Sequence, residues 1–176
     1  ADRIQELGDD LLMRLDARGW YCYSPSKTLG SGDLREELGL SKDRKLLVAY
    51  TSSIDEVNAQ LAMSEALGKP TSPEPQPFVD QIAWIRSLVD YVASSNDLQL
   101  VVRIHPREGA NQREKAQSQH LAALRKAFAG ELPNCVFVWP EDTVSSYDLA
   151  ELADVALISW SSIGVELARL GIPVLA

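Results

Sequence analysis

Residues 157–166 read Leu-Ile-Ser-Trp-Ser-Ser-Ile-Gly-Val-Glu, the pattern of a buried strand, a Ser/Gly turn and the first turn of a helix. Such a turn presents backbone N–H groups and hydroxyls to an anion, and the helix dipole adds positive potential. Two more polar loops follow earlier apolar runs: Thr51-Ser52-Ser53 and Arg103-Ile104-His105-Pro106. Because parallel strands end at the same edge of a sheet, the three loops predict one ligand site.

Short apolar runs alternate with helical patterns on both sides of this stretch. The runs predict strands at 46–50, 99–104, 135–138, 154–159 and 173–176, and the helical patterns fall near 78–95, 113–129, 146–152 and 163–170. Strands that are apolar on both faces are typical of a parallel sheet covered by helices. We therefore predict a Rossmann-like α/β fold: a doubly wound parallel sheet of about five strands with helices on both faces. With strand order 3-2-1-4-5, the ligand crevice lies between the first and fourth strands.

Two segments do not fit the alternation. Residues 1–30 form a helix at 3–18 and a turn-rich linker, which we expect to come from a preceding lobe; a short helix at 33–39 then leads into the domain at 31–176. The chain stops as its last strand finishes, so we expect a fragment of a longer protein. Residues 55–77 end in a Pro-rich run and predict irregular structure, either a mobile flap over the site or a surface insertion.

Composition excludes several classes of protein. The chain has 176 residues, 45% of them hydrophobic and 24% charged, and its formal net charge of −8 argues against a general nucleic-acid binder. Cys22 and Cys135 have no companion ligands nearby in the sequence, so we expect two reduced thiols and no metal site. The sequence has neither a signal-peptide pattern nor an apolar run of about 20 residues. We therefore expect a cytoplasmic protein, which could also associate peripherally with the inner face of a membrane.

The Ser/Gly turn supplies four candidate ligand-binding residues. Ser161 and Ser162 can donate hydroxyls to a phosphate, and Gly164 would let the phosphate approach the backbone closely. An ordinary helix N-cap explains the same serines without a ligand. Glu166 lies in the first helical turn, where it would either accept hydrogen bonds from sugar hydroxyls or only stabilise the helix dipole.

The second polar loop supplies Arg103 and His105. Their alternate spacing on an extended segment aims both side chains the same way, and such groups are costly at a strand end unless they have partners. An anionic or heterocyclic ligand would provide those partners; the alternative is a satisfied histidine beside a surface arginine. We expect Arg107 and Glu108, which follow, to be solvated.

The loop after the first strand adds Thr51, Ser52 and Ser53 to the nucleotide-binding candidates. Asp55 and Glu56 come directly after it. Paired carboxylates can do acid/base work, so these two are weak candidates for a catalytic base, although exposed loop acids are more common.

With its RIHP segment, its Ser159-to-Glu166 loop and its closing ARLGIPVL, residues 168–175, the chain resembles the C-terminal, donor-binding lobe of GT-B glycosyltransferases. More narrowly, residues 33–176 resemble bacterial capsule polysaccharide biosynthesis glycosyltransferases. In such enzymes an HP motif and a Ser-Ser or Ser-Thr motif accompany CMP-activated donors, as in bacterial sialyltransferases, Kdo transferases and glycerophosphate transferases. The matching positions here are His105-Pro106 and Ser161-Ser162.

The resemblance implies a metal-independent transferase lobe that binds a nucleotide sugar, with a CMP-type donor favoured and a UDP-type donor as the alternative. Its other partners would be a saccharide or lipid-linked acceptor and an N-terminal lobe, absent from these residues, that usually carries the general base. UDP-N-acetylglucosamine 2-epimerases share the fold, an HP element and a Ser/Gly turn followed by Glu, so an epimerase is the rival enzyme. A non-catalytic nucleotide- or protein-binding module is the rival from another class.

Overall fold

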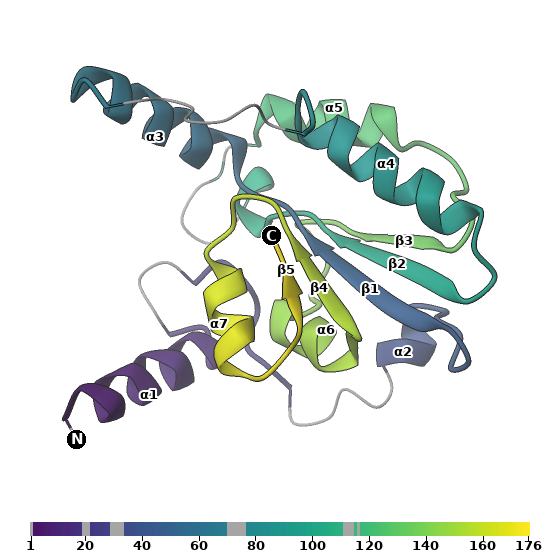
Figure 1. Cartoon of the computed structure of the whole chain (residues 1–176), viewed down its shortest axis with the longest axis horizontal. Coiled ribbons are helices and arrows are strands. Elements are labelled where there is room, and N and C mark those ends of the chain that lie inside the picture. Colours follow the sequence, from purple (N-terminus) through teal and green to yellow (C-terminus); the bar gives the residue numbers. More distant parts are fainter. Residues whose placement is uncertain (1, 19–21, 29–33, 70–76, 111–114, 116) are drawn as a thin grey trace.

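The computed structural model describes the whole chain except residues 1, 19–21, 29–33, 70–76, 111–114 and 116. A five-stranded parallel sheet forms its centre (Figure 1). The strands are β1 (Lys45–Tyr50), β2 (Leu98–Arg103), β3 (Cys135–Val138), β4 (Val155–Ile158) and β5 (Val174–Leu175). Their order, β3-β2-β1-β4-β5, confirms the predicted fold and its topological switch at β1 and β4.

Helices cover both faces of this sheet because successive strand residues point to opposite sides. Leu46, Val48 and Tyr50 of β1 pack with α2 (Leu34–Glu37), α6 (Ser146–Leu152) and α7 (Ile163–Arg169). Ala49 faces the other side, where α4 (Gln81–Ala93) and α5 (Gln119–Ala127) lie. Both faces of every central strand are therefore buried, which explains the continuous apolar runs.

Two predicted helices begin later than their sequence patterns indicate, because a capping side chain fixes each start. Asp80 accepts a hydrogen bond from Ala83 N (2.7 Å) and starts α4, so Phe78 lies outside the helix. Ser118 accepts one from Leu121 N (3.1 Å) and starts α5. Half of the earlier part of the pattern at 113–129 falls outside the described residues.

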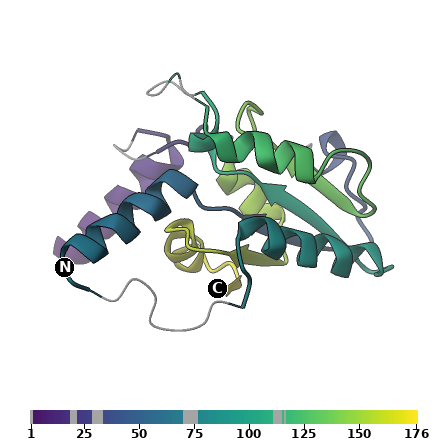
Figure 2. The same cartoon turned by 90° about the horizontal axis from the view of Figure 1, so that it is seen from above.

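The prediction of irregular structure at 55–77 is wrong for its first part, where α3 spans Ile54–Ala66. Its sequence, IDEVNAQLAMSEA, consists largely of good helix formers and contains neither Gly nor Pro. None of its residues is buried, so it lacks the strong apolar stripe by which sequence patterns reveal a helix. Figures 1 and 2 show α3 leaving the end of β1 and projecting away from the sheet. Most of the Pro-rich run lies outside the described residues.

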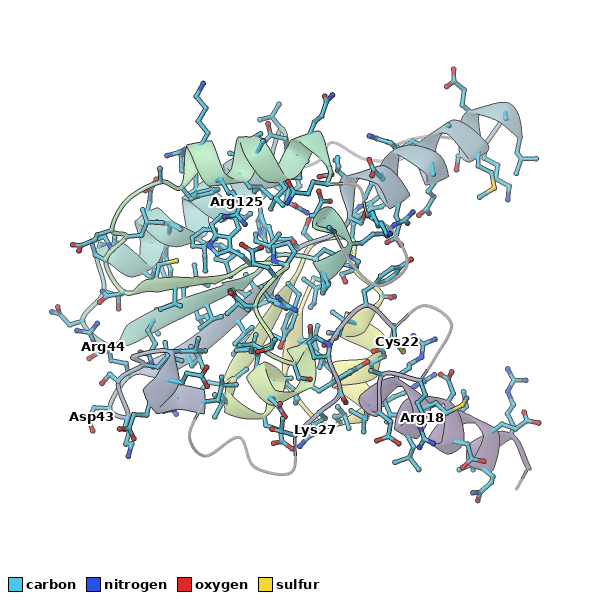
Figure 3. All side chains as sticks on the ribbon, turned by 180° about the vertical axis from the view of Figure 1, so that it is seen from behind. Arg18, Cys22, Lys27, Asp43, Arg44 and Arg125 are labelled. Atoms are coloured by element: carbon cyan, nitrogen blue, oxygen red, sulfur yellow. The ribbon has the colours of Figure 1, made fainter. Side chains whose placement is uncertain are left out.

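The N-terminal segment packs against the domain. Helix α1 (Asp2–Leu15) precedes a strap, residues 22–28, that runs beside α6 and α7; Cys22 and Lys27 mark the strap in Figure 3. Ser24 Oγ accepts a hydrogen bond from Ser146 N (2.9 Å), and Thr28 N and Oγ1 donate to the Asp148 carboxylate at 3.0–3.2 Å. These bonds place the strap at the carboxyl edge of the sheet.

Candidate functional site

The loops that follow β1, β2 and β4 meet at the carboxyl edge of the sheet. Tyr50, the last residue of β1, is in register with Arg103 of β2 on one side and with Ile158 of β4 on the other. All three strands therefore end at the same level, and their following loops face one another.

A small cavity of about 80 Å³, called here the inner cavity, lies among these loops. Its lining includes six of the predicted ligand-binding residues: Thr51, Arg103, His105, Ser161, Ser162 and Glu166. Others come from α6 and from the N-terminal segment: Ser146, Tyr147, Arg14, Cys22, Tyr23 and Ser24. A larger outer groove of about 480 Å³ adjoins the inner cavity and shares Arg14, Tyr23, His105, Ser162 and Glu166 with it.

The loop after β1 is hydrogen-bonded to the loops after β2 and β4. Thr51 N donates to Arg103 O (3.1 Å), and Thr51 Oγ1 accepts from His105 N (2.8 Å), which ties the β1 loop to the β2 loop. Ser52 Oγ donates to Ser159 O and ties it to the β4 loop. Ser53 is the buried N-cap residue of α3. Of these three predicted residues, only Thr51 lines the inner cavity.

Arg103 is a buried cation with spare donors. Its side chain is 1% exposed, and Nη1 donates to Trp139 O at 2.8 Å. Nε and Nη2 are buried and have no hydrogen-bond partner among the described residues. Burial lowers the pKa of Arg103 to about 10, so the group still carries its charge at neutral pH. The nearby carboxylates of Asp142 and Glu141 favour the charged form of Arg103, but neither forms a hydrogen bond with Nε or Nη2. Buried donors without a partner are costly, and an anion entering the inner cavity would satisfy them.

His105 stands beside Arg103 as a neutral donor. Its Nδ1 accepts from Arg107 N (3.2 Å), so the neutral ring carries its proton on Nε2. Burial of the ring lowers the pKa of His105 to about 4; Arg103 and Arg107 act in the same direction and Glu56 opposes them. At neutral pH the site therefore offers a guanidinium and a neutral imidazole N–H to an anion.

The low pKa of His105 predicts a pH-dependent stability. An unfolded chain takes up the proton near pH 6.5, before the folded protein does, so stability supplied by the neutral ring is lost as the pH falls from about 6.5 to about 4. We expect a loss of about 2–3 kcal/mol in the free energy of unfolding over this window. Urea denaturation from pH 7 to pH 4 measures it. His105→Gln should be less pH-dependent by this amount, and equal pH dependence of the two proteins would contradict the assignment.

The Ser/Gly turn is built differently from an ordinary helix cap. Ser162 is the N-cap residue of α7, but its side chain forms no capping hydrogen bond. Ser161 and Ser162 both line the inner cavity. Gly164 does not: a Cβ at this position would point toward Ile158 and lie 3.3 Å from its Cγ1, so the glycine lets α7 pack closely on β4.

Glu166 is buried and already has two protein partners. Arg14 Nη1 donates to Oε1 at 2.9 Å, and Tyr147 Oη donates to Oε2 at 2.6 Å. Burial and the hydrogen bond to Glu166 raise the pKa of the Tyr147 hydroxyl, which stays protonated as the donor. Glu166 thus joins α1, α6 and α7 at the wall of the inner cavity.

Sequence reasoning missed two contributions to the site. Arg14, Cys22, Tyr23 and Ser24 of the N-terminal segment line the inner cavity, and no motif in this segment marks them as ligand-binding residues. Glu108, predicted to be solvated, is 1% exposed: it accepts from Ile54 N (2.7 Å) and from Ser118 Oγ. Its carboxylate caps α3 and joins the loops after β1 and β2. The only sequence signal for Glu108 was its position shortly after the HP pair.

The two candidate bases are separate. Asp55 is exposed in the first turn of α3, whereas Glu56 pairs with Arg107 (2.8 Å) and lines the outer groove. Neither lines the inner cavity. Within the described part of the chain, no group of three His, Cys, Asp or Glu residues is arranged to hold a metal ion, and no helix is long and apolar enough to span a membrane.

No protein-family model and no curated protein sequence matches the chain. Three chains of solved structures match it. One is a variant of the wall teichoic acid polymerase TagF, with 15% sequence identity and a TM-score of 0.47 over 82% of this chain. The match covers 27% of the polymerase chain, so the protein described here spans about a quarter of that length.

Proposed function

We propose that the chain is the donor-binding lobe of a GT-B glycosyltransferase, which binds a nucleotide sugar through its phosphate in the inner cavity. The observation that supports this most strongly is Arg103, a buried guanidinium whose Nε and Nη2 lack partners among the described residues and which lines the inner cavity. The cavity also lies at the topological switch of the sheet, where ligands of such folds bind.

The proposed chemistry is stabilisation of a leaving phosphate. As the bond between the sugar carbon and the phosphate oxygen breaks and the acceptor oxygen bonds to that carbon, negative charge grows on the phosphate oxygens. Arg103, the His105 Nε2–H and the hydroxyls of Ser161 and Ser162 would meet that charge with fixed donors, and fixed donors need no reorganisation during the reaction. The acceptor and the general base would be supplied mainly by a second lobe, with Asp55 and Glu56 as weak candidates on this one.

The proposed biological setting is synthesis of capsule or another surface polysaccharide, in the cytoplasm or at the inner face of the membrane, with a saccharide or lipid-linked acceptor. This rests on the motif resemblance at His105-Pro106 and Ser161-Ser162. The same motifs favour a CMP-type donor, with a UDP-type donor as the alternative.

A thermal-shift panel of CMP, UDP, GDP and their sugar conjugates tests the proposal. At a ligand concentration of 100 times Kd, binding stabilises the folded state by about 2.7 kcal/mol, which corresponds to roughly 5–10 °C for a domain of this size. We expect one nucleotide and its conjugates to raise the Tm by this amount, and adenosine to leave it unchanged. If no nucleotide shifts the Tm at millimolar concentration, the proposed function is wrong and a protein-binding module becomes the better interpretation.

A further inference from the structure

The size of the inner cavity limits what it can hold. Its volume of about 80 Å³ accommodates a phosphate group but is too small for a whole nucleotide sugar. The outer groove is about six times larger and shares part of its wall with the inner cavity. A phosphate ester that places its phosphate at Arg103 and His105 would therefore extend into the outer groove.

The charges of the outer groove favour hydroxyl groups over a second anion. Three carboxylates line it, those of Asp10, Glu56 and Glu166. Arg14 is shared between two of them, at 3.0 Å from Asp10 and 2.9 Å from Glu166. The third pairs with Arg107 at 2.8 Å. Carboxylates only accept hydrogen bonds and keep lone pairs to spare, so they can take hydroxyl donors from a ligand.

Arg169 is the remaining cation of the groove. It lies exposed in the last turn of α7, and no ion pair to it occurs among the described residues. Arg14 and Arg107 already balance two of the three carboxylates. Solvent and salt screen the exposed charge of Arg169, so it offsets the remaining negative charge only in part.

Tyr23 gives the groove an aromatic wall. Its ring centroid lies 5.8 Å from that of His105, and the Arg107 guanidinium carbon lies 5.8 Å from the centroid of the Tyr23 ring. An aromatic face beside carboxylates suits a ligand that carries C–H groups and hydroxyls together.

We propose that the outer groove holds the uncharged, hydroxyl-bearing group attached to the bound phosphate, and that its carboxylates select against a ligand with a carboxylate in the same place. Among the CMP-activated donors named above, this favours a glycerophosphate donor over sialic acid or Kdo, which carry a carboxylate. The proposal rests on the proposed function for the phosphate end of the ligand. It makes α1 and the strap part of the specificity site, since Asp10, Arg14 and Tyr23 come from this segment.

Two matched ligand pairs test the selectivity by calorimetric titration. UDP-glucose and UDP-glucuronic acid differ only in a hydroxymethyl against a carboxylate group, and glucose 1-phosphate and glucuronic acid 1-phosphate repeat the comparison without a nucleotide. We expect the neutral member of each pair to bind about tenfold more tightly, because like charges repel in the groove. Glu56→Gln should reduce this ratio. Glu65→Gln, a change on the exposed end of the same helix, should leave it unchanged.

The outcomes separate the two proposals. If no nucleotide of the CMP, UDP and GDP panel binds and both sugar phosphates fail to bind, the proposed function fails and this inference fails with it. If they bind but the acidic member of each pair binds equally or more tightly, the groove does not select as inferred while the phosphate site stands. Loss of such an acidic preference in Arg169→Gln would assign the selection to Arg169 instead of to the carboxylates.

Discussion

Replacing Arg103 by Met is expected to weaken binding of the phosphate ligand by about 3 kcal/mol, more than 100-fold in Kd, because charge-assisted hydrogen bonds from Nε and Nη2 are lost. The free energy of unfolding of the ligand-free protein should change by no more than about 1 kcal/mol, since losing the bond to Trp139 O is offset by removing a poorly partnered buried charge. Calorimetric titration and urea denaturation measure the two effects separately.

Arg86→Met is the matched control. Arg86 also donates to one backbone carbonyl, Ala127 O at 3.1 Å, but it lies exposed on α4 and lines neither the inner cavity nor the outer groove. We expect normal ligand affinity from this variant. Unchanged affinity in Arg103→Met as well would make Arg103 a structural residue and remove the main support for a phosphate site.

Replacing Glu166 by Leu should lower the free energy of unfolding by about 3 kcal/mol. The hydroxyl of Tyr147 loses its hydrogen-bond acceptor, and Arg14 loses one of its two carboxylate partners. The loss should also release the contact of α1 with α7. Hydrogen exchange should therefore accelerate in α1 more than in β1 and β2.

Tyr147→Phe and Glu65→Leu complete this test. The first removes only the donor and should cost about 1–2 kcal/mol. The second changes an exposed carboxylate on α3 and should stay within about 0.5 kcal/mol of the parent protein. A Glu166→Leu protein as stable as Glu65→Leu would show that the contacts of Glu166 with Arg14 and Tyr147 contribute little.

The sheet and the position of the site could be predicted from sequence because local patterns determine them. Strands buried on both faces must be continuously apolar, and β1, β2 and β4 fall within about one residue of their predicted bounds. Once the strands are parallel, the polar loops at Thr51, Arg103 and Ser161 must meet at one edge, and Thr51, Arg103 and Ser161 line one cavity.

The remaining features depend on contacts between distant residues. Arg14 meets Glu166 across 152 positions of sequence, and nothing in the pattern of α1 singles out that arginine from Arg18. Glu108 lies two residues after a proline in a polar loop, where sequence patterns predict a solvated side chain. In the structure its carboxylate accepts hydrogen bonds from two other segments, at Ile54 and Ser118. Helix α3 was missed for the opposite reason: none of its residues is fully buried, and no strong apolar stripe marks it.

We expect an activated donor to bind by its phosphate in the inner cavity, and a crystal structure of the chain with the nucleotide that gives the largest thermal shift would show whether it does. A phosphate oxygen should lie about 3 Å from Arg103 Nε or Nη2, with the His105 Nε2–H directed toward the same phosphate. A nucleotide bound away from the carboxyl edge of the sheet, with Arg103 Nε and Nη2 still lacking a partner, would contradict this expectation.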